Sequence, residues 1–171
     1  MKYVFITAVA CVIATTSLQA QQNPPASPPA KASETLNSGA TIAINYSQPS
    51  LKGRKVGENV EPMKNRVWRM GANTATSFET DKDITIQGQK LPAGKYSVFG
   101  LWEDDGFTVI FNKDTGFWGT QYEQHKNNDA LRVKANVKNA DSSQEQLTYT
   151  IDKAGKVNLL WGNMVIGLDV K

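Results

Sequence analysis

Three stretches of the sequence combine cations, aromatic rings and glycines in a way that a buried core does not require. Arginine side chains bind carboxylate or phosphate groups through paired hydrogen bonds, and an exposed tryptophan offers a flat apolar face with a polar tip. Together these groups are suited to an anionic or sugar-like ligand. The stretches are residues 46–54, 67–73 and 111–119, and the candidate ligand-binding residues in them are Lys52, Arg54, Trp68, Arg69, Asn73, Asn112 and Trp118.

Each candidate also has a structural interpretation, which the sequence leaves open. Trp68 and Trp118 are consistent with positions in a core. Arg54 and Arg69 are equally suited to pairing with structural carboxylates or to binding loop carbonyls. The sequence does not show whether the three stretches meet in space, so the predicted pocket depends on the fold that positions them.

Catalysis and metal binding find little support in the sequence. It has no G-x-S-x-G motif, and its single histidine, His125, lies in the polar stretch 122–128, which is typical of a surface loop. A transition-metal site usually needs two or more histidine or cysteine ligands. The acidic stretches 81–83 and 103–105 look like hairpin turns rather than calcium loops. We therefore predict no catalytic residues, no metal site and no cofactor.

The elements that must position the candidate residues are strands. From about residue 34 onward, apolar and polar residues alternate with a period of two, which predicts strands with one buried face. Segments 96–102 and 107–111 are apolar on both faces and predict central strands, joined by a turn at 103–106. We find no sustained helical period. The alternating segments are 41–46, 131–138, 147–151 and 164–170.

Many short strands with glycine, proline and asparagine between them predict an all-β fold. We expect an antiparallel β-sandwich or barrel with Greek-key-like connections. Leu91, Gly94 and Tyr96 have the Leu-x-x-Gly-x-Tyr spacing of a tyrosine corner, in which the hydroxyl binds back to the chain. We therefore expect Tyr96 to have a structural role rather than to contact a ligand.

Residues 1–20 are typical of a secretory signal peptide. A lysine at the start, an apolar segment at 4–14 and the segment Ser17-Leu18-Gln19-Ala20 predict cleavage after Ala20, with Leu18 larger than the ideal residue at its position. Residues 21–36 contain four prolines and predict a flexible linker, followed by a single β-sandwich domain at 37–171. No segment is long enough to span a bilayer. We therefore expect a periplasmic or secreted protein with no transmembrane segment after signal cleavage.

Composition and charge narrow the class further. The chain has 171 residues, 40% of them hydrophobic, and a formal net charge of +3. These values exclude a disordered chain, a collagen-like chain and a coiled coil. The basic residues are scattered rather than grouped, which argues against a nucleic-acid partner. The only cysteine, Cys11, lies in the predicted signal peptide, so we expect no disulfide in the mature chain.

Four ordered motifs resemble a bacterial secreted family known as domain of unknown function 2911. They are residues 46–54 (YSQPSLKGR), 68–73 (WRMGAN), 91–97 (LPAGKYS) and 111–119 (FNKDTGFWG). With the flanking strands they cover most of the chain from about residue 38 onward. The resemblance implies an exported or periplasmic protein of diderm bacteria, but no activity and no catalytic residues. Polar residues on loops near strand ends are the ones that we expect to bind a ligand.

Three functions are consistent with these residues. The best supported is a non-enzymatic binding module for a small anionic or glycan ligand. The alternative is an envelope protein–protein interaction module, in which the aromatic loops form a protein-facing patch. A metal-independent hydrolase that uses carboxylates or Tyr96 has the least support.

Overall fold

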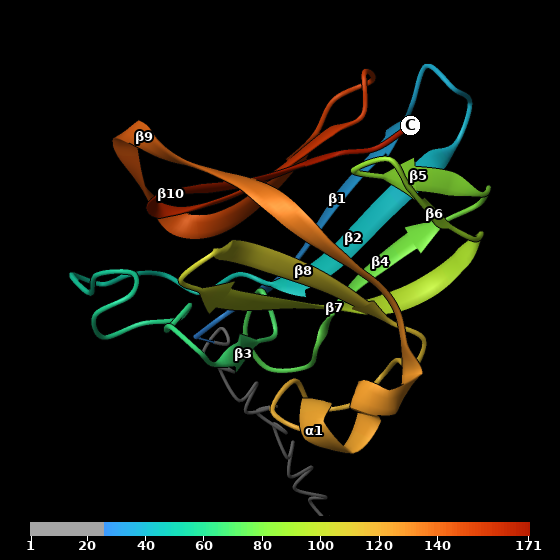
Figure 1. The fold of residues 1–171 in the computed structure, drawn as a ribbon. Coiled ribbons are helices and arrows are strands. Elements are labelled where there is room, and N and C mark those ends of the chain that lie inside the picture. The colour runs from blue at the N-terminus through green and yellow to red at the C-terminus, as the bar shows by residue number, and fades with distance from the viewer. Residues whose placement is uncertain (1–25) are drawn as a thin grey trace, which may run out of the picture.

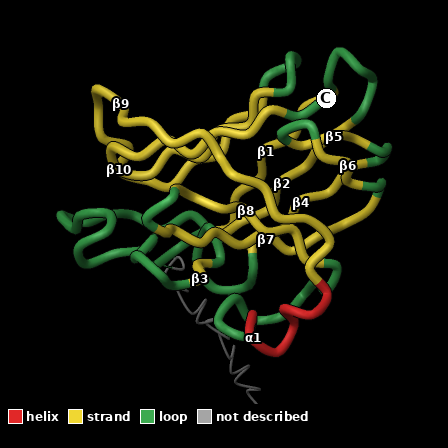
Figure 2. The backbone as a smooth tube through the Cα atoms, in the orientation of Figure 1, coloured by secondary structure: helices red, strands yellow, loops and turns green. Residues whose placement is uncertain are grey.

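The computed structural model describes residues 26–171, and strands make up most of it (Figures 1 and 2). The predicted signal peptide and residues 21–25 of the predicted linker lie outside the described residues. The elements are β1 (Pro29–Thr35), β2 (Thr41–Ser47), β3 (Val67–Trp68), β4 (Thr76–Thr80), β5 (Ile84–Ile86), β6 (Gln89–Leu91), β7 (Gly94–Glu103), β8 (Gly106–Asn112), α1 (Tyr122–His125), a 3-10 turn (Lys126–Asn128), β9 (Asp129–Ile151) and β10 (Lys156–Asp169).

The strands form one large antiparallel sheet and one small hairpin. The large sheet has the order β1-β2-β4-β7-β8-β9-β10, with β3 paired to β7, while β5 pairs with β6. Strands β9 and β10 curl back over the others and make a half-barrel (Figure 1). The register between them shifts around Gly162, and such bulges bend a strand pair. The prediction of an all-β sandwich or barrel is confirmed.

The connections differ from the Greek-key pattern that we expected. Neighbouring strands of the large sheet follow one another along the chain, interrupted only by β3 and by the β5–β6 hairpin, so the sheet is a meander. The predicted central strands are confirmed, because β7 and β8 lie in the middle of this order. Their register places Val98 opposite Phe111 and joins the strands at Glu103 and Gly106, as the predicted turn requires.

The main core lies inside the half-barrel, and it is built by the alternation seen in the sequence. In β2, for example, Ile42, Ile44 and Tyr46 are buried, while Asn45, which lies between Ile44 and Tyr46, faces outward. Strands β7 and β8 are buried on their outer face as well, because the segment 113–128 covers it. A second, smaller core forms there, from Phe99, Ile110 and Tyr122.

The predicted tyrosine corner has the contact that defines it. The Tyr96 hydroxyl donates a hydrogen bond to the Pro92 carbonyl oxygen at 2.9 Å. Leu91 is completely buried, and Gly94 lies against the Tyr96 ring. These contacts fix the chain where it leaves the β5–β6 hairpin and enters β7. Tyr96 therefore has a structural role here.

Part of the predicted linker is a strand. Residues 29–35 form β1, which pairs with β2 along its whole length at the edge of the sheet. Proline is tolerated at the first residue of an edge strand, which is the position of Pro29. Ala30 and Ala32 pack against the main core. Prolines and small alanines hide the period of two in this segment. The linker that we predicted over residues 21–36 is therefore too long, because residues 29–35 belong to the sheet.

Residues 122–128 also differ from the expected loop, because they form α1 and a 3-10 turn. A helix of four residues is too short to give a periodic signal in the sequence. Its buried residue, Tyr122, closes the second core. Among residues 26–171, no helix has the length and apolar character needed to cross a membrane.

Candidate functional site

The three stretches predicted from the sequence meet around one cleft beside β3, which we call the arginine cleft. It has a volume of about 490 Å³. Its walls come from the loop between β2 and β3, from residues 67–72, and from residues 119–120 after β8, together with Trp161 of β10. The polar and aromatic residues that matter for its chemistry are Arg54, Glu61, Arg66, Trp68 and Arg69.

Arg69 is the most unusual group in the arginine cleft. Its Nε atom is buried and has no hydrogen-bond partner among residues 26–171. Burial lowers the pKa of the Arg69 guanidinium below its ordinary value, and the negative charge of Glu61 partly offsets this effect. A buried polar group without a partner is costly, so the unpaired Nε marks Arg69 as a candidate binding residue.

The Arg69 side chain is held by the loop that follows β8. A β-carbon at Gly119 would lie 2.7 Å from Arg69 Cβ and 2.9 Å from Arg69 Cγ, closer than packed carbons approach. The backbone N–H of Gly119 donates a hydrogen bond to the Asn73 carbonyl oxygen at 3.2 Å. The missing side chain at Gly119 therefore lets the two loops meet and sets the course of the Arg69 side chain between them.

Two further arginines and one carboxylate line the cleft. Arg66 Nη2 lies 2.8 Å from Glu61 Oε1, and the Arg66 side chain is largely exposed. Arg54 donates hydrogen bonds to the carbonyl oxygens of Leu51 and Ser50, at 2.9 and 2.7 Å. Arg54 thus binds carbonyl oxygens of its own loop, which is the structural role that the sequence left open for it. It also lines the cleft. Three guanidinium groups and one carboxylate give the cleft a positive charge.

Trp68 lines the arginine cleft as part of its wall. The side chain is only 5% exposed, and its Nε1–H donates a hydrogen bond to the Gly71 carbonyl oxygen at 3.3 Å. Its face is therefore used for packing rather than for stacking on a ligand. Lys52 is exposed and does not line the cleft, and its backbone N–H donates to Glu145.

Asn73 holds the loops together next to the cleft. It adopts a left-handed backbone conformation (φ +59°), which asparagine tolerates better than most residues. Its Nδ2 donates to the Ser47 hydroxyl at 3.3 Å and to the Ser27 carbonyl oxygen at 3.4 Å. Asn73 therefore connects the predicted stretches, and its side chain is already engaged.

Asn112 lies away from the arginine cleft, which it does not line. It is completely buried, and its Nδ2 donates to the His125 carbonyl oxygen and to Asp129 Oδ1, both at 2.8 Å. Its Oδ1 accepts a hydrogen bond from the Asp114 backbone N–H at 2.9 Å. Asn112 anchors the segment 113–128, which carries the loop residues at the cleft.

His125 takes part in the same anchoring. Its Nδ1 lies 2.8 Å from Asp114 Oδ2, and its ring stacks on Phe117 with 3.8 Å between the ring centres. The hydrogen bonds from Asn128 and His125 lower the pKa of the Asp114 carboxyl. The His125 side chain is only about a quarter exposed, so it is more tightly held than the expected surface histidine.

Trp118 is the one predicted aromatic residue that is open to solvent, with 50% of its surface exposed. It lies on the segment 116–119 and forms an isolated β-bridge with Thr74. The Trp118 backbone N–H donates to the Gln121 side chain at 3.1 Å. The exposed indole is available for stacking on a ligand, as the sequence predicted for a tryptophan of this site.

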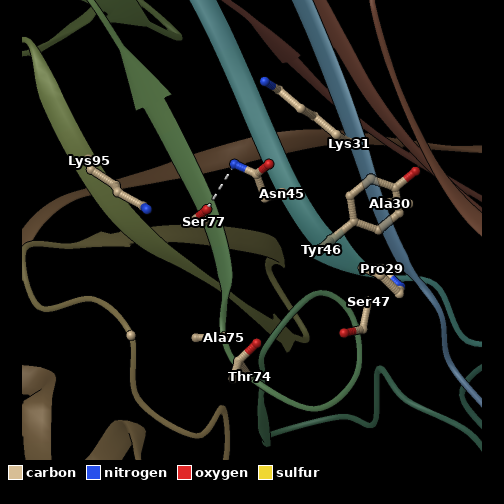
Figure 3. A pocket seen from close by; sticks show the side chains of 11 residues that line it. Pro29, Ala30, Lys31, Asn45, Tyr46, Ser47, Thr74, Ala75, Ser77 and Lys95 are labelled. Carbon is tan, nitrogen blue, oxygen red and sulfur yellow. Dashed lines mark hydrogen bonds between the residues drawn. The ribbon is translucent and has the colours of Figure 1, made fainter. Parts of the chain in front are cut away.

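A second cavity, which we call the lysine face, lies on the outer side of the large sheet and has a volume of about 510 Å³. Figure 3 shows Asn45 and Ser77 between Lys31 and Lys95, from strands β2, β4, β1 and β7. Asn45 Nδ2 donates to the Ser77 hydroxyl at 3.4 Å. Neither lysine forms an ion pair within the described part of the chain.

Several residues of these cavities were not singled out from the sequence. Arg66 lies one residue outside the stretch 67–73, and a slightly longer window would have included it. Lys95 lies inside the LPAGKYS motif, but we gave a structural role only to Leu91, Gly94 and Tyr96 of that motif. Glu61 and Lys31 carry no local signal, because only the fold brings them to the cavities.

The comparison with known proteins agrees with the four motifs. A family model described as "Protein of unknown function (DUF2911)" matches residues 27–170. No curated protein and no solved structure shows significant similarity to the chain. The match begins close to β1 and ends in the last residues of the chain, so it covers the whole described fold. The chain therefore belongs to the family described as Protein of unknown function (DUF2911), as the motifs indicated.

Proposed function

We propose that this protein is a non-enzymatic binding module for an anionic ligand, and that Arg69 binds the carboxylate or phosphate group of that ligand. The observation that carries the proposal is the buried Arg69 Nε, which has no partner among residues 26–171. A guanidinium group presents two parallel N–H donors to such an anion. Arg66 and Arg54 add positive charge around the same cleft.

The exposed surface supports a small ligand or a glycan more than a protein partner. Stable protein interfaces bury about 1,600 Å² and have an apolar, aromatic centre. In the described part of the chain, the large hydrophobic side chains that are exposed are Trp118 and Val137, and they come from different elements. The envelope protein–protein alternative therefore has less support than ligand binding.

The hydrolase alternative also has less support. The single histidine, His125, pairs with Asp114 and stacks on Phe117, which is a structural use of the imidazole. The Tyr96 hydroxyl binds the Pro92 carbonyl oxygen, and burial raises its pKa. Both groups are engaged in holding the fold.

We also propose that the protein is exported to the periplasm or secreted, because residues 1–20 have the pattern of a cleaved signal peptide. The anionic ligand would then be a component of the cell envelope or its surroundings. The mass of the N-terminal peptide, measured on protein from the cytoplasmic, periplasmic and secreted fractions, tests this. Export requires a chain that begins at Gln21, and a cytoplasmic chain that begins at Met1 contradicts it.

The binding proposal is tested by thermal unfolding of the purified protein with added glucuronate, glycerol phosphate or inorganic phosphate, and with neutral glucose for comparison. A ligand at one hundred times its dissociation constant adds about 2.7 kcal/mol to the stability of the folded state. That corresponds to a rise in Tm of several degrees. We expect at least one anion to raise the Tm, and glucose to leave it unchanged.

The matched variants are Arg69→Gln and Lys90→Gln, which remove the same charge. Lys90 is exposed on the β5–β6 hairpin and lines neither cavity. Arg69→Gln should abolish the anion-dependent rise in Tm, whereas Lys90→Gln should retain it. If every anion fails to change the Tm, or if both variants respond like the wild type, the binding proposal is wrong.

A further inference from the structure

The arginine cleft and the lysine face lie next to each other. Gly116 lines the lysine face and Gly119 lines the arginine cleft. Even a fully extended chain covers at most about 11 Å over three residues. The openings of the two cavities are therefore separated by a short distance along one loop, and Trp118 lies on that loop.

The rim between the two cavities is a fixed structure. Thr74 forms a β-bridge with Trp118. Two hydrogen bonds flank this bridge. The Ala75 backbone N–H donates to the Phe117 carbonyl oxygen at 3.2 Å, and the Gly119 backbone N–H donates to the Asn73 carbonyl oxygen at 3.2 Å. We call this paired segment the Trp118 rim. Its hydrogen bonds hold the backbone that carries the exposed Trp118, on the segment that joins Gly116 at one cavity to Gly119 at the other.

Both cavities present positive charge. The arginine cleft contains three guanidinium groups and one carboxylate, whereas the lysine face contains Lys31 and Lys95 and no acidic lining residue. Between the lysines, Asn45 and Ser77 supply amide and hydroxyl groups that can bind sugar hydroxyls. Two cationic cavities, joined by the segment that carries the exposed Trp118, suit a long ligand with repeated negative charges.

We propose that the ligand is a linear acidic polysaccharide that binds across both cavities. One carboxylate pairs with Arg69, a sugar ring stacks on Trp118 at the rim, and a later carboxylate reaches Lys31 and Lys95. This inference rests on the proposed function, because the arginine cleft provides the first contact. Joining the two contacts in one chain makes the second binding event intramolecular, which increases affinity without any new kind of contact.

The test compares galacturonate with its linear hexamer in calorimetric titrations of the purified protein. Neutral galactose and a neutral galactose hexamer are the matched ligand controls. The hexamer should bind at least about tenfold more tightly than the monomer. The double variant Lys31→Gln/Lys95→Gln should lose that gain and keep the affinity for the monomer, and Trp118→Ala should reduce the gain.

The control Lys82→Gln/Lys90→Gln removes the same charge from exposed positions that line neither cavity. This control should keep the tight binding of the hexamer. If both double variants lose the same amount of affinity for the hexamer, only net charge matters, and the inference is overturned. A hexamer that binds no more tightly than the monomer would overturn it as well.

These outcomes separate the inference from the proposed function. Binding of the monomer that depends on Arg69, without a gain for the hexamer, leaves the anion site intact and removes only the spanning ligand. If Arg69→Gln leaves the affinity for both acidic ligands unchanged, the proposed function fails, and the inference fails with it. Circular dichroism of each variant shows whether the fold is retained.

Discussion

The Arg69 side chain packs against Gly119, and there is no space for a β-carbon between them. Arg69 directly follows β3, whereas Gly119 lies in the loop after β8. The position of the guanidinium therefore depends on a contact between two loops that are distant in the sequence. This contact links the packing of the fold to the charge of the arginine cleft, and it can be changed without removing a charge.

We predict that Gly119→Ala weakens anion binding, although it leaves every charged group in place. The added methyl group would overlap the Arg69 side chain, and such overpacking costs about 1–3 kcal/mol. Urea unfolding measures the loss of stability, and titration with the anion measures the loss of affinity. In the Arg69→Ala background, the same change should cost less stability. Equal costs in both backgrounds would show that the two residues are not coupled.

We predict that Arg69→Met has opposite effects on stability and on binding. Methionine keeps an unbranched side chain beside Gly119 but removes a guanidinium whose Nε is buried without a partner in the described residues. The free energy of unfolding should stay the same or rise by about 1 kcal/mol, because a buried unpaired polar group is costly. Anion binding should disappear. A strongly destabilised variant would mean that the guanidinium serves the fold.

We predict that Asn112→Ala loosens the segment 113–128. The substitution removes hydrogen bonds to the His125 carbonyl oxygen, to Asp129 and to the Asp114 N–H. Leaving such buried groups unpaired should cost about 3 kcal/mol. Hydrogen exchange should become faster in residues 113–128 and stay slow in β2. Asn45→Ala, at an exposed position, is the control and should change stability by less than about 0.5 kcal/mol.

We predict a dependence on alkaline pH that comes from Tyr122. Burial, followed by the hydrogen bond to Asp129, raises the pKa of the Tyr122 hydroxyl from 10.0 to about 12. In the unfolded chain the hydroxyl loses its proton first, so the stability that it contributes is complete below pH 10.0 and is lost as the pH rises toward 12. The wild type should therefore lose stability across this window.

The measurement for this prediction is urea unfolding at several pH values, compared with Tyr122→Phe. The variant lacks the ionisable group, so its stability should fall less between pH 10.0 and about 12. The difference in free energy of unfolding between wild type and variant should shrink across that range. A difference that stays constant or grows with pH contradicts the assignment.

Local patterns in the sequence were sufficient for much of the fold. The alternation in residues 41–46 and the apolar segments 96–102 and 107–111 correctly placed β2, β7 and β8, because burial of a strand face needs only a period of two. β1 was missed, since alanines and prolines carry little hydrophobic signal. The meander order was missed too, because pairing between strands depends on contacts that are distant in the sequence.

The candidate site was predictable in its residue types but not in their roles. Arg69 and Arg54 line one cleft as expected, and Trp118 is exposed beside it. Asn112 lies at the end of β8, where we expected a ligand contact, yet it anchors the segment 113–128. Amide groups serve both purposes with the same donors and acceptors, so the sequence alone cannot separate them. The lysine face required the register of the strands.

The most direct test of the account is the NMR signal of the Arg69 Nε–H group during addition of glucuronate or phosphate. The chain has four arginines, so Arg69→Lys identifies the signal by its disappearance. Arg132, whose Nε binds Asp129 at 3.0 Å, serves as an internal reference. We predict that the Arg69 signal shifts and saturates while the Arg132 signal stays in place. An Arg69 signal that does not move, or two signals that move together without saturation, would contradict an anion site at Arg69.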